Sequence, residues 1–341
     1  MTAYDAILYL SFGGPEGPDD VMPFLENVTR GKRVPEERLR EVESHYLELG
    51  GKSPINDQNA AFVGALKSEL DDRGIDLPIY VGNRNWKPYL ADTVSDMRND
   101  GIKQALCFVT SAFSSYSGCR QYLENIDEAR ATVGEGAPII DKIRSCFNHP
   151  RFVQAAVDRL TIAASKLSPE DSERAVVVFT AHSLPTSMSQ SCDYEAQLKD
   201  ICAIVSESAG MPNYRIAYQS RSGPPQMPWL EPDILDALQS IIDDGLRAVI
   251  VMPIGFLSDH MEVVWDLDRE AFAFASRHKM RWVRAATVGT HPVFVSGVAD
   301  MIEERLGTRT GRAAVGHFEA KPDVCAPDCC ARGAEGASRR P

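Results

Sequence analysis

Short apolar runs alternate with helical periodicities along most of the chain, and this alternation restricts the fold more than any other feature. The apolar runs are continuous, as in strands that are buried on both faces. They lie at residues 6–10, 78–82, 104–110, 175–180, 214–218 and 248–253. The helical periods between them include residues 59–70, 122–132, 152–166, 194–208 and 262–277. The pattern predicts βαβ units, and therefore an α/β fold with mainly parallel sheets flanked by helices.

The two halves of this pattern have similar outlines, which predicts two doubly wound, Rossmann-like domains. One strand ends in Ser-Phe-Gly-Gly-Pro at residues 11–15, and another ends in Ala-His-Ser-Leu-Pro at residues 181–185. Because open parallel sheets bind ligands at the carboxyl ends of their strands, both turns are candidate ligand-binding loops. We expect an N-terminal domain at residues 1–150, a C-terminal domain at residues 151–310 and a Gly/Ala/Arg-rich tail at residues 311–341.

Charge and hydropathy argue against several classes of protein. The 341 residues include 36 Lys and Arg against 48 Asp and Glu, a net charge of −12 without a basic stripe, which disfavours a nucleic-acid partner. The longest stretch without a polar residue, 248–257, is much shorter than the roughly 18 residues of a membrane helix. The N-terminus lacks the basic segment of a signal peptide, so we expect a cytoplasmic protein, and its modest apolar surface favours a monomer.

The most distinctive polar residues are one histidine and one column of carboxylates. His182 follows the apolar run at residues 175–180, which places it at the carboxyl end of a strand. Glu262, Asp266 and Glu270 recur every four residues, so on a helix they form an acidic stripe. Taken alone, the histidine could be a structural side chain beside a loop, and the stripe could be a solvated helix face.

The surroundings of this stripe favour a functional site. Like charges at this spacing repel, so they do not stabilise a surface helix. The preceding strand and the aromatic residues Phe256 and Trp265 indicate that the helix lines a cleft. Imidazole accepts protons near neutral pH and binds Fe, Zn or Cu, while carboxylates supply oxygen ligands. A column of such groups, unlike a compact cage, predicts a path for metal ions or protons.

Five motifs resemble those of the ferrochelatases, enzymes that insert ferrous iron into a porphyrin. The motifs are Leu-Ser-Phe-Gly-Gly-Pro at 10–15, Gly-Gly-Lys-Ser-Pro-Ile at 50–55, Phe-Thr-Ala-His-Ser-Leu-Pro at 179–185, Tyr-Gln-Ser-Arg-Ser-Gly-Pro at 218–224 and Pro-Ile-Gly-Phe-Leu-Ser-Asp-His-Met-Glu at 253–262. They occur in the family's order, and the resemblance extends from residue 4 to about residue 306. It implies two Rossmann-like domains around a porphyrin cleft, in agreement with the alternation described above.

The resemblance also implies roles for the histidine and the carboxylates. His182 matches the family's active-site histidine, and Glu262 matches a carboxylate that acts in metal binding and proton removal. Asp266 and Glu270 match an acidic ladder along a π-helical stretch, whose wider turn aligns every fourth residue more closely than an α-helix does. Two pyrrole N–H protons must leave as Fe²⁺ enters the ring, so a base is needed at the porphyrin face.

Four further residues match porphyrin-contacting positions of the family. Phe12 lies where many relatives have a tyrosine, so no axial oxygen is available there. Arg30, Ser53 and Tyr116 match positions that hold propionates; Arg30 could pair with a carboxylate bidentately or be a solvated arginine. The basic run at residues 30–33 and the absence of a presequence or apolar lip resemble actinobacterial coproporphyrin III ferrochelatases. We therefore expect coproporphyrin III as substrate, with protoporphyrin IX as the alternative, and a transient contact with the downstream coprohaem decarboxylase.

Three of the eight cysteines lie together in the tail, as Cys325, Cys329 and Cys330. No second C-x₂₋₄-C pair accompanies them, which argues against a zinc site. Three tail cysteines and one from the body would supply the four thiolates of a [2Fe–2S] cluster. In ferrochelatases with such a cluster the fourth ligand lies mid-chain before a helix, and the resemblance assigns it to Cys146. Free thiols on the tail are the alternative, and the other cysteines, Cys119 among them, are expected in the core or on helix faces.

Two other functions fit the sequence less well. A non-catalytic porphyrin- or iron-binding sensor with an active tail cluster would keep the pocket but could dispense with His182 and Glu262. A His/carboxylate metallohydrolase would need closely spaced ligands such as H-E-x-x-H, and that motif does not occur. His260 lies two residues before Glu262, so on a helix the two side chains would point different ways. The motifs therefore favour a chelatase.

Overall fold

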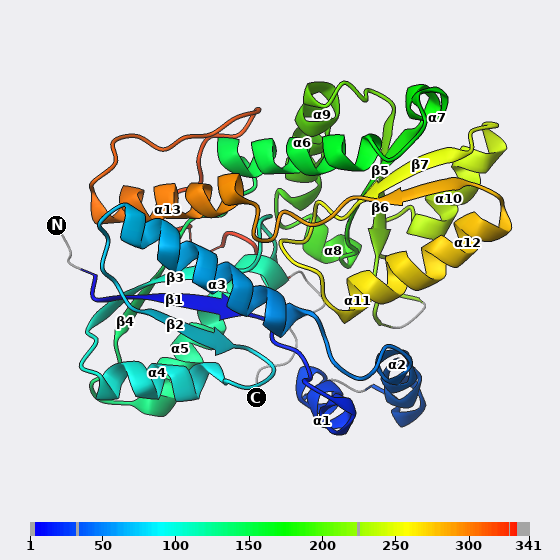
Figure 1. Cartoon of the computed structure of the whole chain (residues 1–341). Coiled ribbons are helices and arrows are strands. Elements are labelled where there is room, and N and C mark those ends of the chain that lie inside the picture. Colours follow the sequence, from blue (N-terminus) through cyan, green and yellow to red (C-terminus); the bar gives the residue numbers. More distant parts are fainter. Residues whose placement is uncertain (1–3, 32–33, 224–225, 327, 333–341) are drawn as a thin grey trace.

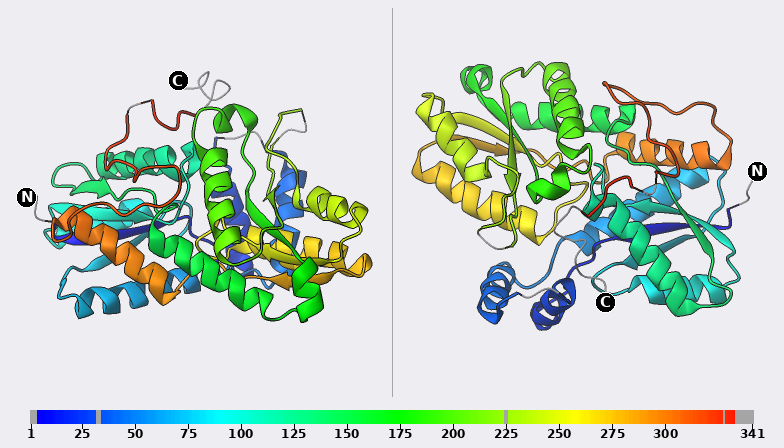
Figure 2. Two further views of the ribbon diagram at one scale, coloured as in Figure 1. Left: turned by 90° about the horizontal axis from the view of Figure 1, so that it is seen from above. Right: turned by 180° about the vertical axis from the view of Figure 1, so that it is seen from behind.

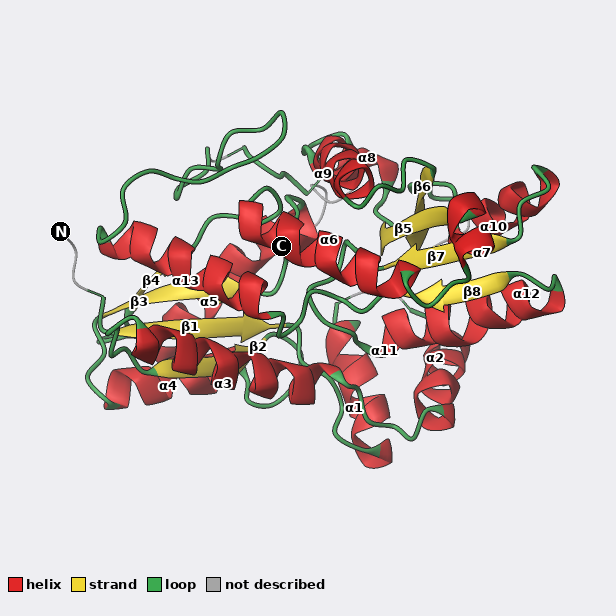
Figure 3. Ribbon diagram, turned by 45° about the horizontal axis from the view of Figure 1, so that its top comes forward, coloured by secondary structure: helices red, strands yellow, loops and turns green. Residues whose placement is uncertain are grey.

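The computed structural model describes residues 4–31, 34–223, 226–326 and 328–332. Over these residues the chain forms two parallel β-sheets, one in each half of the sequence, with helices packed on both faces of each sheet (Figures 1 and 3). The strand order is β2-β1-β3-β4 in the first sheet and β6-β5-β7-β8 in the second. The predicted α/β class with two parallel-sheet domains is therefore confirmed.

The elements follow one another in the order that the sequence pattern predicts. The strands are β1 (Ala6–Ser11), β2 (Ile79–Asn83), β3 (Gln104–Val109), β4 (Ile139–Lys142), β5 (Val176–His182), β6 (Tyr214–Gln219), β7 (Ala248–Met252) and β8 (Arg281–Arg284). The helices of the first half are α1 (Pro18–Val28), α2 (Glu36–Glu48), α3 (Ile55–Asp72), α4 (Leu90–Asn99), η1 (Tyr116–Arg120) and α5 (Gln121–Val133). Those of the second half are α6 (Pro150–Ala164), α7 (Pro169–Arg174), α8 (Thr186–Ser189), α9 (Tyr194–Ser208), α10 (Ile234–Asp243), α11 (Met261–Val263), η2 (Val264–Ala271), α12 (Phe272–Arg277) and α13 (Pro292–Leu306).

The sequence pattern does not predict two of the strands, β4 and β8, and both lie at a sheet edge. β4 and β8 each have only four residues, and most of their side chains are partly or fully exposed. Both pair on one side only, β4 with β3 and β8 with β7. Because their polar side chains face solvent, neither segment contains the continuous apolar run that identifies the central strands.

The last helix, α13, crosses from the second half of the chain to the first. It packs against α3 and α6, so it covers one face of the first sheet (Figure 1). Phe294 and Val298 of α13 belong to the same buried apolar core as Leu66 of α3 and Phe179 of β5. The sequence-derived boundary at residues 150 and 151 therefore separates the two sheets, but the helix that joins them lies on both sides of it.

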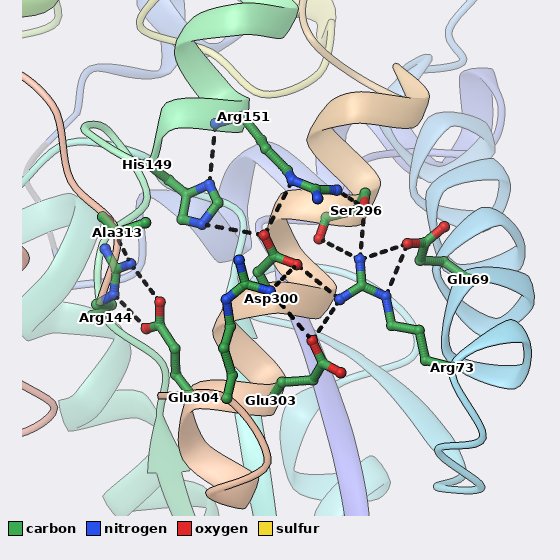
Figure 4. Close-up of polar contacts among 11 residues, drawn as sticks. Glu69, Arg73, Arg144, His149, Arg151, Ser296, Asp300, Glu303, Glu304 and Ala313 are labelled. Carbon is green, nitrogen blue, oxygen red and sulfur yellow. Dashed lines mark hydrogen bonds and ion pairs between the residues drawn. The ribbon is translucent and has the colours of Figure 1, made fainter. Parts of the chain in front are cut away.

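A buried ionic cluster fixes α13 in this position (Figure 4). The carboxylate of Asp300 on α13 is 2% exposed, and it pairs with Arg73 of α3 at 2.8 Å. Arg151 of α6 reaches the same carboxylate at 3.1 Å, as does Arg309 just beyond α13. Glu303 also accepts Arg73 at 2.7 Å. Since an uncompensated buried charge costs several kcal/mol, these contacts hold α13 to helices of both halves.

Beyond α13 the tail runs back over the junction between the two sheets (Figure 2). The side-chain amide of Asn148 donates to the carbonyl of Phe318 at 2.8 Å, and the ring of Phe318 packs edge-on against Phe147. The backbone N–H of His317 donates to Asp200 of α9 at 2.8 Å, and Lys321 pairs with Asp193 at 2.6 Å. The tail therefore contacts both halves of the chain before its cysteines.

Among the described residues, no helix combines the length and the apolar character needed to cross a bilayer. The predicted cytoplasmic location stays a prediction.

Candidate active site

His182 is the last residue of β5, and backbone contacts fix its position. Its carbonyl accepts a hydrogen bond from the hydroxyl of Tyr194 at 3.0 Å. Its ring nitrogen Nδ1 lies 2.6 Å from the carbonyl of Ser183, which makes Nδ1 the protonated nitrogen that donates. The ring is about one-third exposed (35%), and Nε2 is the nitrogen left to accept a proton or bind a ligand.

Glu262 on α11 lies opposite this ring nitrogen, with its Oε2 3.6 Å from Nε2 of His182. Burial lowers the pKa of His182, but the hydrogen bond to Glu262 and its charge outweigh this effect. The carbonyl of Ser183 and the charge of Asp266 act in the same direction, so the pKa of His182 is raised overall. His182 is therefore a stronger base than an ordinary histidine.

A close backbone contact places the acidic helix beside His182. The N–H of Gly255 donates to the carbonyl of Thr180 at 3.0 Å. A Cβ atom at Gly255 would lie only 2.6 Å from the Cα of Ala181, so the loop before α11 can cross β5 here only with a glycine. This crossing brings Glu262 to the end of the strand that carries His182.

Asp266 and Glu270 lie on the π-helix η2 and Glu262 lies on α11 directly before it, so the π-helical stretch that the resemblance implies is present. The pKa of Asp266 is raised to about 7, first by burial and then by the charges of Glu262 and Glu270, which together outweigh the opposing hydrogen bonds from Ser220 and Gln219. Ser220 Oγ lies 2.5 Å from Asp266, and Gln219 Nε2 lies 3.2 Å away. Glu270 and Glu262 are exposed and Asp266 between them is partly buried, so the column is open to solvent at both ends, and its Glu262 end contacts His182.

His260 is a site residue that the sequence reasoning dismissed. It has an extended backbone (φ −135°, ψ 177°) and lies just before α11, so the helical spacing argument against it was wrong. Burial lowers the pKa of His260, as does the charge of His182, whereas the charge of Glu262 raises it. The motif containing His260 was recognised, but only the tertiary structure places this ring beside His182 and Glu262.

The first half of the chain reaches the acidic helix through α2 and α3. The ring of His45 stacks on Trp265, with centroids 3.9 Å apart. The pKa of the Tyr46 hydroxyl is raised, first by burial and then by the charge of Glu262. Gln58 of α3 accepts a hydrogen bond from the backbone N–H of Asp259 at 2.8 Å. Sequence reasoning missed His45, Tyr46 and Gln58, since none lies in a strand-end turn.

The four predicted porphyrin-contacting residues lie in different environments. Phe12 is half-buried and packs edge-on against Phe24. Ser53 is buried, and its backbone N–H donates to the carbonyl of Pro15, which joins the first two motifs. Arg30 is exposed just beyond α1, and Tyr116 is 4% exposed at the start of η1.

The structure corrects the predicted cysteine set. Cys146 is 1% exposed in the apolar core, where burial raises its pKa to about 12, so it is poorly suited to act as a thiolate ligand. The thiol of Cys119 on η1 instead lies near Cys325 and Cys330, and the three are coupled, so that the interaction lowers the pKa of Cys119 and raises those of Cys325 and Cys330. A single sequence does not show which body cysteine will lie near the tail in the folded chain, so Cys119 was not predictable as the partner of the tail thiols.

The tail thiols form pairs around Cys119. Sγ of Cys329 lies 3.6 Å from Sγ of Cys330, while Cys325 and Cys330 both contact Cys119. Within the described part of the chain, no three or more His, Cys, Asp or Glu side chains converge as a site for a metal ion. A [2Fe–2S] cluster takes two thiolates at each of two irons, so the donor type and number of these four thiols fit such a group.

Comparison with protein families and with curated relatives gives one consistent result. The family model described as Ferrochelatase matches residues 4–306. A ferrochelatase from Rhodopirellula baltica is 52% identical over 331 residues, which cover 97% of this chain and 94% of the relative. A coproporphyrin III ferrochelatase from Nocardia farcinica is 46% identical, with 96% and 97% coverage. One from Mycobacterium marinum is 50% identical over 304 residues, with 88% and 87% coverage.

Among solved structures, SirB from Bacillus subtilis with Fe³⁺ has a similar fold. The TM-score is 0.55 at 14% sequence identity, and the match covers 89% of this chain and 98% of SirB. At this identity the likeness concerns the fold alone, and it agrees with two parallel-sheet domains.

Proposed function

Because the chain belongs to the ferrochelatase family, we propose that it inserts ferrous iron into coproporphyrin III and releases two protons, as a step of haem b biosynthesis. The observation that carries the proposal is the contact between His182 and Glu262, which lies on α11 directly before the π-helix that carries Asp266 and Glu270. The relatives from Nocardia farcinica and Mycobacterium marinum, named coproporphyrin III ferrochelatases, support this substrate. Protoporphyrin IX is the second candidate, since the Rhodopirellula baltica relative is named only a ferrochelatase.

His182 is the base in this proposal. A pyrrole N–H bond breaks, its proton moves to Nε2 of His182, and the electron pair stays on the pyrrole nitrogen to bind iron. Glu262, 3.6 Å from Nε2, stabilises the imidazolium that forms. The hydrogen bond from Nδ1 to the carbonyl of Ser183 keeps Nε2 available as the acceptor.

The acidic column is proposed to exchange the substrate metal for protons. Glu262, Asp266 and Glu270 offer oxygen ligands, which suit a hydrated divalent ion as it loses water. The exposed Glu270 is the proposed entry point, and the partly buried Asp266 is the intermediate position on the way to Glu262. With a pKa of about 7, Asp266 can take up or release a proton at neutral pH.

We place the porphyrin between the two domains, against residues of both. Phe12 offers an aromatic face without an oxygen, so it does not ligate the iron. Arg30 makes no ion pair with a described carboxylate, so its guanidinium is available for a propionate. Ser53 and Tyr116 are proposed to contact other propionates.

We propose that Cys119, Cys325, Cys329 and Cys330 hold a [2Fe–2S] cluster, with Cys119 in the place first assigned to Cys146. When bound, such a group supplies a cross-link between the tail and η1. The chain already aligns these parts, because Arg120 donates to the carbonyls of Ala326 and Cys329, each at 3.0 Å. The support for this set is the proximity of Cys119 to Cys325 and Cys330, whose interaction lowers the pKa of one thiol and raises those of the other two.

The test of the main proposal is anaerobic absorbance spectroscopy with Fe²⁺ and, separately, coproporphyrin III and protoporphyrin IX. Loss of the four free-base visible bands, faster with coproporphyrin III, is the expected result. His182→Ala is expected to abolish the conversion, whereas His278→Ala, at an exposed histidine on the far end of α12, is a matched control. Faster conversion of protoporphyrin IX would overturn the substrate assignment, and spectral shifts without insertion would favour a porphyrin-binding sensor.

We further propose that the protein acts as a monomer and delivers its product by transient contact with the downstream coprohaem decarboxylase. Light scattering at micromolar concentration tests the first statement, and a mass of about twice the chain mass would contradict it. Faster decarboxylation of enzyme-bound than of free coprohaem would support the second statement.

A further inference from the structure

The side chain of Arg284 joins two carboxylates that do not belong to the acidic column. Its Nη2 lies 2.6 Å from Oδ1 of Asp259, in the loop before α11, and its Nε lies 2.9 Å from Oδ1 of Asp268 on η2. Arg284 is the last residue of β8, and its side chain is only 14% exposed. Because one guanidinium binds both carboxylates, it spans residues 260–267, the segment that carries Glu262.

The π-helix η2 is held at both edges of the second sheet. β6 and β8 are the edge strands of this sheet, and Arg284 at the end of β8 binds Asp268 (Figure 3). At the other edge, Ser220 directly after β6 donates to Asp266 at 2.5 Å. Leu267, between the two aspartates, is fully buried in the same apolar core as the central strands β5 and β7. Together these contacts fix the rotation of η2 about its own axis.

Asp259 connects this arrangement to the first half of the chain and to the proposed base. Its backbone N–H donates to Gln58 of α3 at 2.8 Å, while its carboxylate binds Arg284. Glu262, which lies 3.6 Å from His182, follows only three residues later. A displacement of Asp259 therefore moves the carboxylate that contacts the proposed base.

We propose that Arg284 is a positioning residue for the acidic column. By holding Asp259 and Asp268 together, its guanidinium keeps the column in the orientation that serves His182. Arg284 acts through these two carboxylates and not on the iron or the porphyrin. The inference rests on the proposed function, because it takes the column as the route of the iron. A planar guanidinium suits this task, since its several donors meet two carboxylates in one fixed geometry.

The positive charge of Arg284, acting alone, would have the opposite effect on metal binding. A cation beside the column repels Fe²⁺, so a purely electrostatic role predicts tighter metal binding once the arginine is removed. A positioning role predicts weaker metal binding, because the oxygen ligands lose their alignment. Removal of Asp268 weakens metal binding under both roles. The two partners of this ion pair therefore change metal binding in the same direction only if Arg284 positions the column.

The test measures the KM for Fe²⁺ and the KM for coproporphyrin III of the full-length protein by anaerobic absorbance spectroscopy. Arg284→Ala and Asp268→Ala are each expected to raise the KM for Fe²⁺ about tenfold and to leave the KM for coproporphyrin III unchanged. The double variant is expected to lose little more than either single variant, since both break the same contact. Arg281→Ala is the matched control, because Arg281 lies on the same strand but is 73% exposed and reaches Asp171 only at 3.7 Å.

A conservative variant separates position from charge even if Arg284→Ala does not fold. Asp268→Asn removes the negative charge but keeps an oxygen that can accept from Nε of Arg284, and the Asp268 side chain is 39% exposed. We expect Asp268→Asn to recover most of the wild-type KM for Fe²⁺. An equal rise of this KM in Asp268→Asn and Asp268→Ala would show that the charge decides and would overturn the positioning role.

The arginine variant gives the other decisive outcomes. A lowered or unchanged KM for Fe²⁺ in Arg284→Ala, an equal rise in both KM values, or fully additive losses in the double variant would overturn the inference. If the wild-type protein inserts Fe²⁺ and Arg284→Ala behaves as Arg281→Ala does, this inference alone fails. If the wild-type protein converts no porphyrin, the proposed function fails, and this inference fails with it.

Discussion

The imidazole of His45 and the indole of Trp265 lie face to face, with their centroids 3.9 Å apart and their planes 7° from parallel. His45 belongs to α2 in the first half of the chain, and Trp265 belongs to the π-helix η2 in the second. Because Trp265 directly precedes Asp266, the stack joins the first domain to the acidic column itself. The stack therefore helps to fix the position of the acidic column as well as the contact between the domains.

Loss of this stack is expected to impair iron insertion moderately. An aromatic pair contributes about 0.5–1.5 kcal/mol beyond its buried area, so His45→Ala and Trp265→Ala should each lower kcat/KM about two- to tenfold. The double variant should lose little more than either single one, while Trp265→Phe should retain part of the effect. A double-mutant cycle on kcat/KM checks this expectation, and independent, additive losses would contradict it.

Removal of the Glu262 charge is expected to shift the pH profile toward lower pH. The proposed base works only when neutral, so activity falls as the pH drops through the pKa of His182. Glu262 raises that pKa, so Glu262→Gln should lower it and extend activity to more acidic solutions while the maximal rate falls. The pH dependence of kcat/KM measures this shift, with exposed Glu207→Gln on α9 as the control. An acid limb that does not move would argue against His182 as the base.

The hydroxyl of Ser220 is expected to position Asp266 for the metal ion. Ser220 has a left-handed backbone (φ 60°), so Ser220→Gly removes the donor without adding backbone strain. We expect this variant to raise the KM for Fe²⁺ about tenfold and to leave the KM for porphyrin unchanged. Ser220→Asn tolerates the same backbone and offers a donor, so it should recover part of the loss. An equal rise in both KM values would indicate a general disturbance of the site.

The corrected cysteine set predicts opposite outcomes for two cysteines. Cys119→Ser should remove the visible absorbance and the acid-labile sulfide of a [2Fe–2S] cluster. Cys146→Ala should retain both and lower stability slightly, because Cys146 is a small buried side chain in the core. Iron and sulfide analysis of the two purified variants distinguishes the assignments, and the reverse pattern would restore Cys146 as a ligand.

Asp300→Ala is expected to be strongly destabilising although Asp300 lies outside the active site. The variant leaves Arg73 and Arg151 without the carboxylate that both contact, and such changes cost about 3–5 kcal/mol. The free energy of unfolding in urea measures the loss, with Glu207→Ala, at an exposed residue of α9, as the control. Because the cluster touches no proposed substrate residue, the activity of the folded fraction should be unchanged.

The central strands were predictable because they are buried on both faces and therefore apolar throughout. β5 and β7 each appear in the sequence within a residue or two of their observed ends. The edge strands β4 and β8 have polar exposed faces, so their sequences resemble loops. The crossing of α13 was not predictable, since its apolar residues would suit either sheet.

The polar residues of the site likewise divide into those that a local sequence pattern indicates and those that it does not. His182 and the stripe at Glu262, Asp266 and Glu270 could be found because a strand end and a four-residue spacing are visible in one chain. The argument against His260 assumed that it lies on a helix with Glu262, whereas its backbone is extended, which the sequence does not show. The stack of His45 on Trp265 joins residues that are 220 positions apart, which no local pattern records.

The sequence by itself determined the α/β class, the two-domain order and the histidine with its acidic column, because these depend on short-range periodicity and on the ends of strands. Only the tertiary structure decided that Cys119, and not Cys146, meets the tail thiols, and that Arg332 reaches Tyr116. The physical reason is that such contacts arise from the packing of segments far apart in the chain. A thiol or a guanidinium has the same local sequence signature whether it faces the core, the solvent or a distant tail.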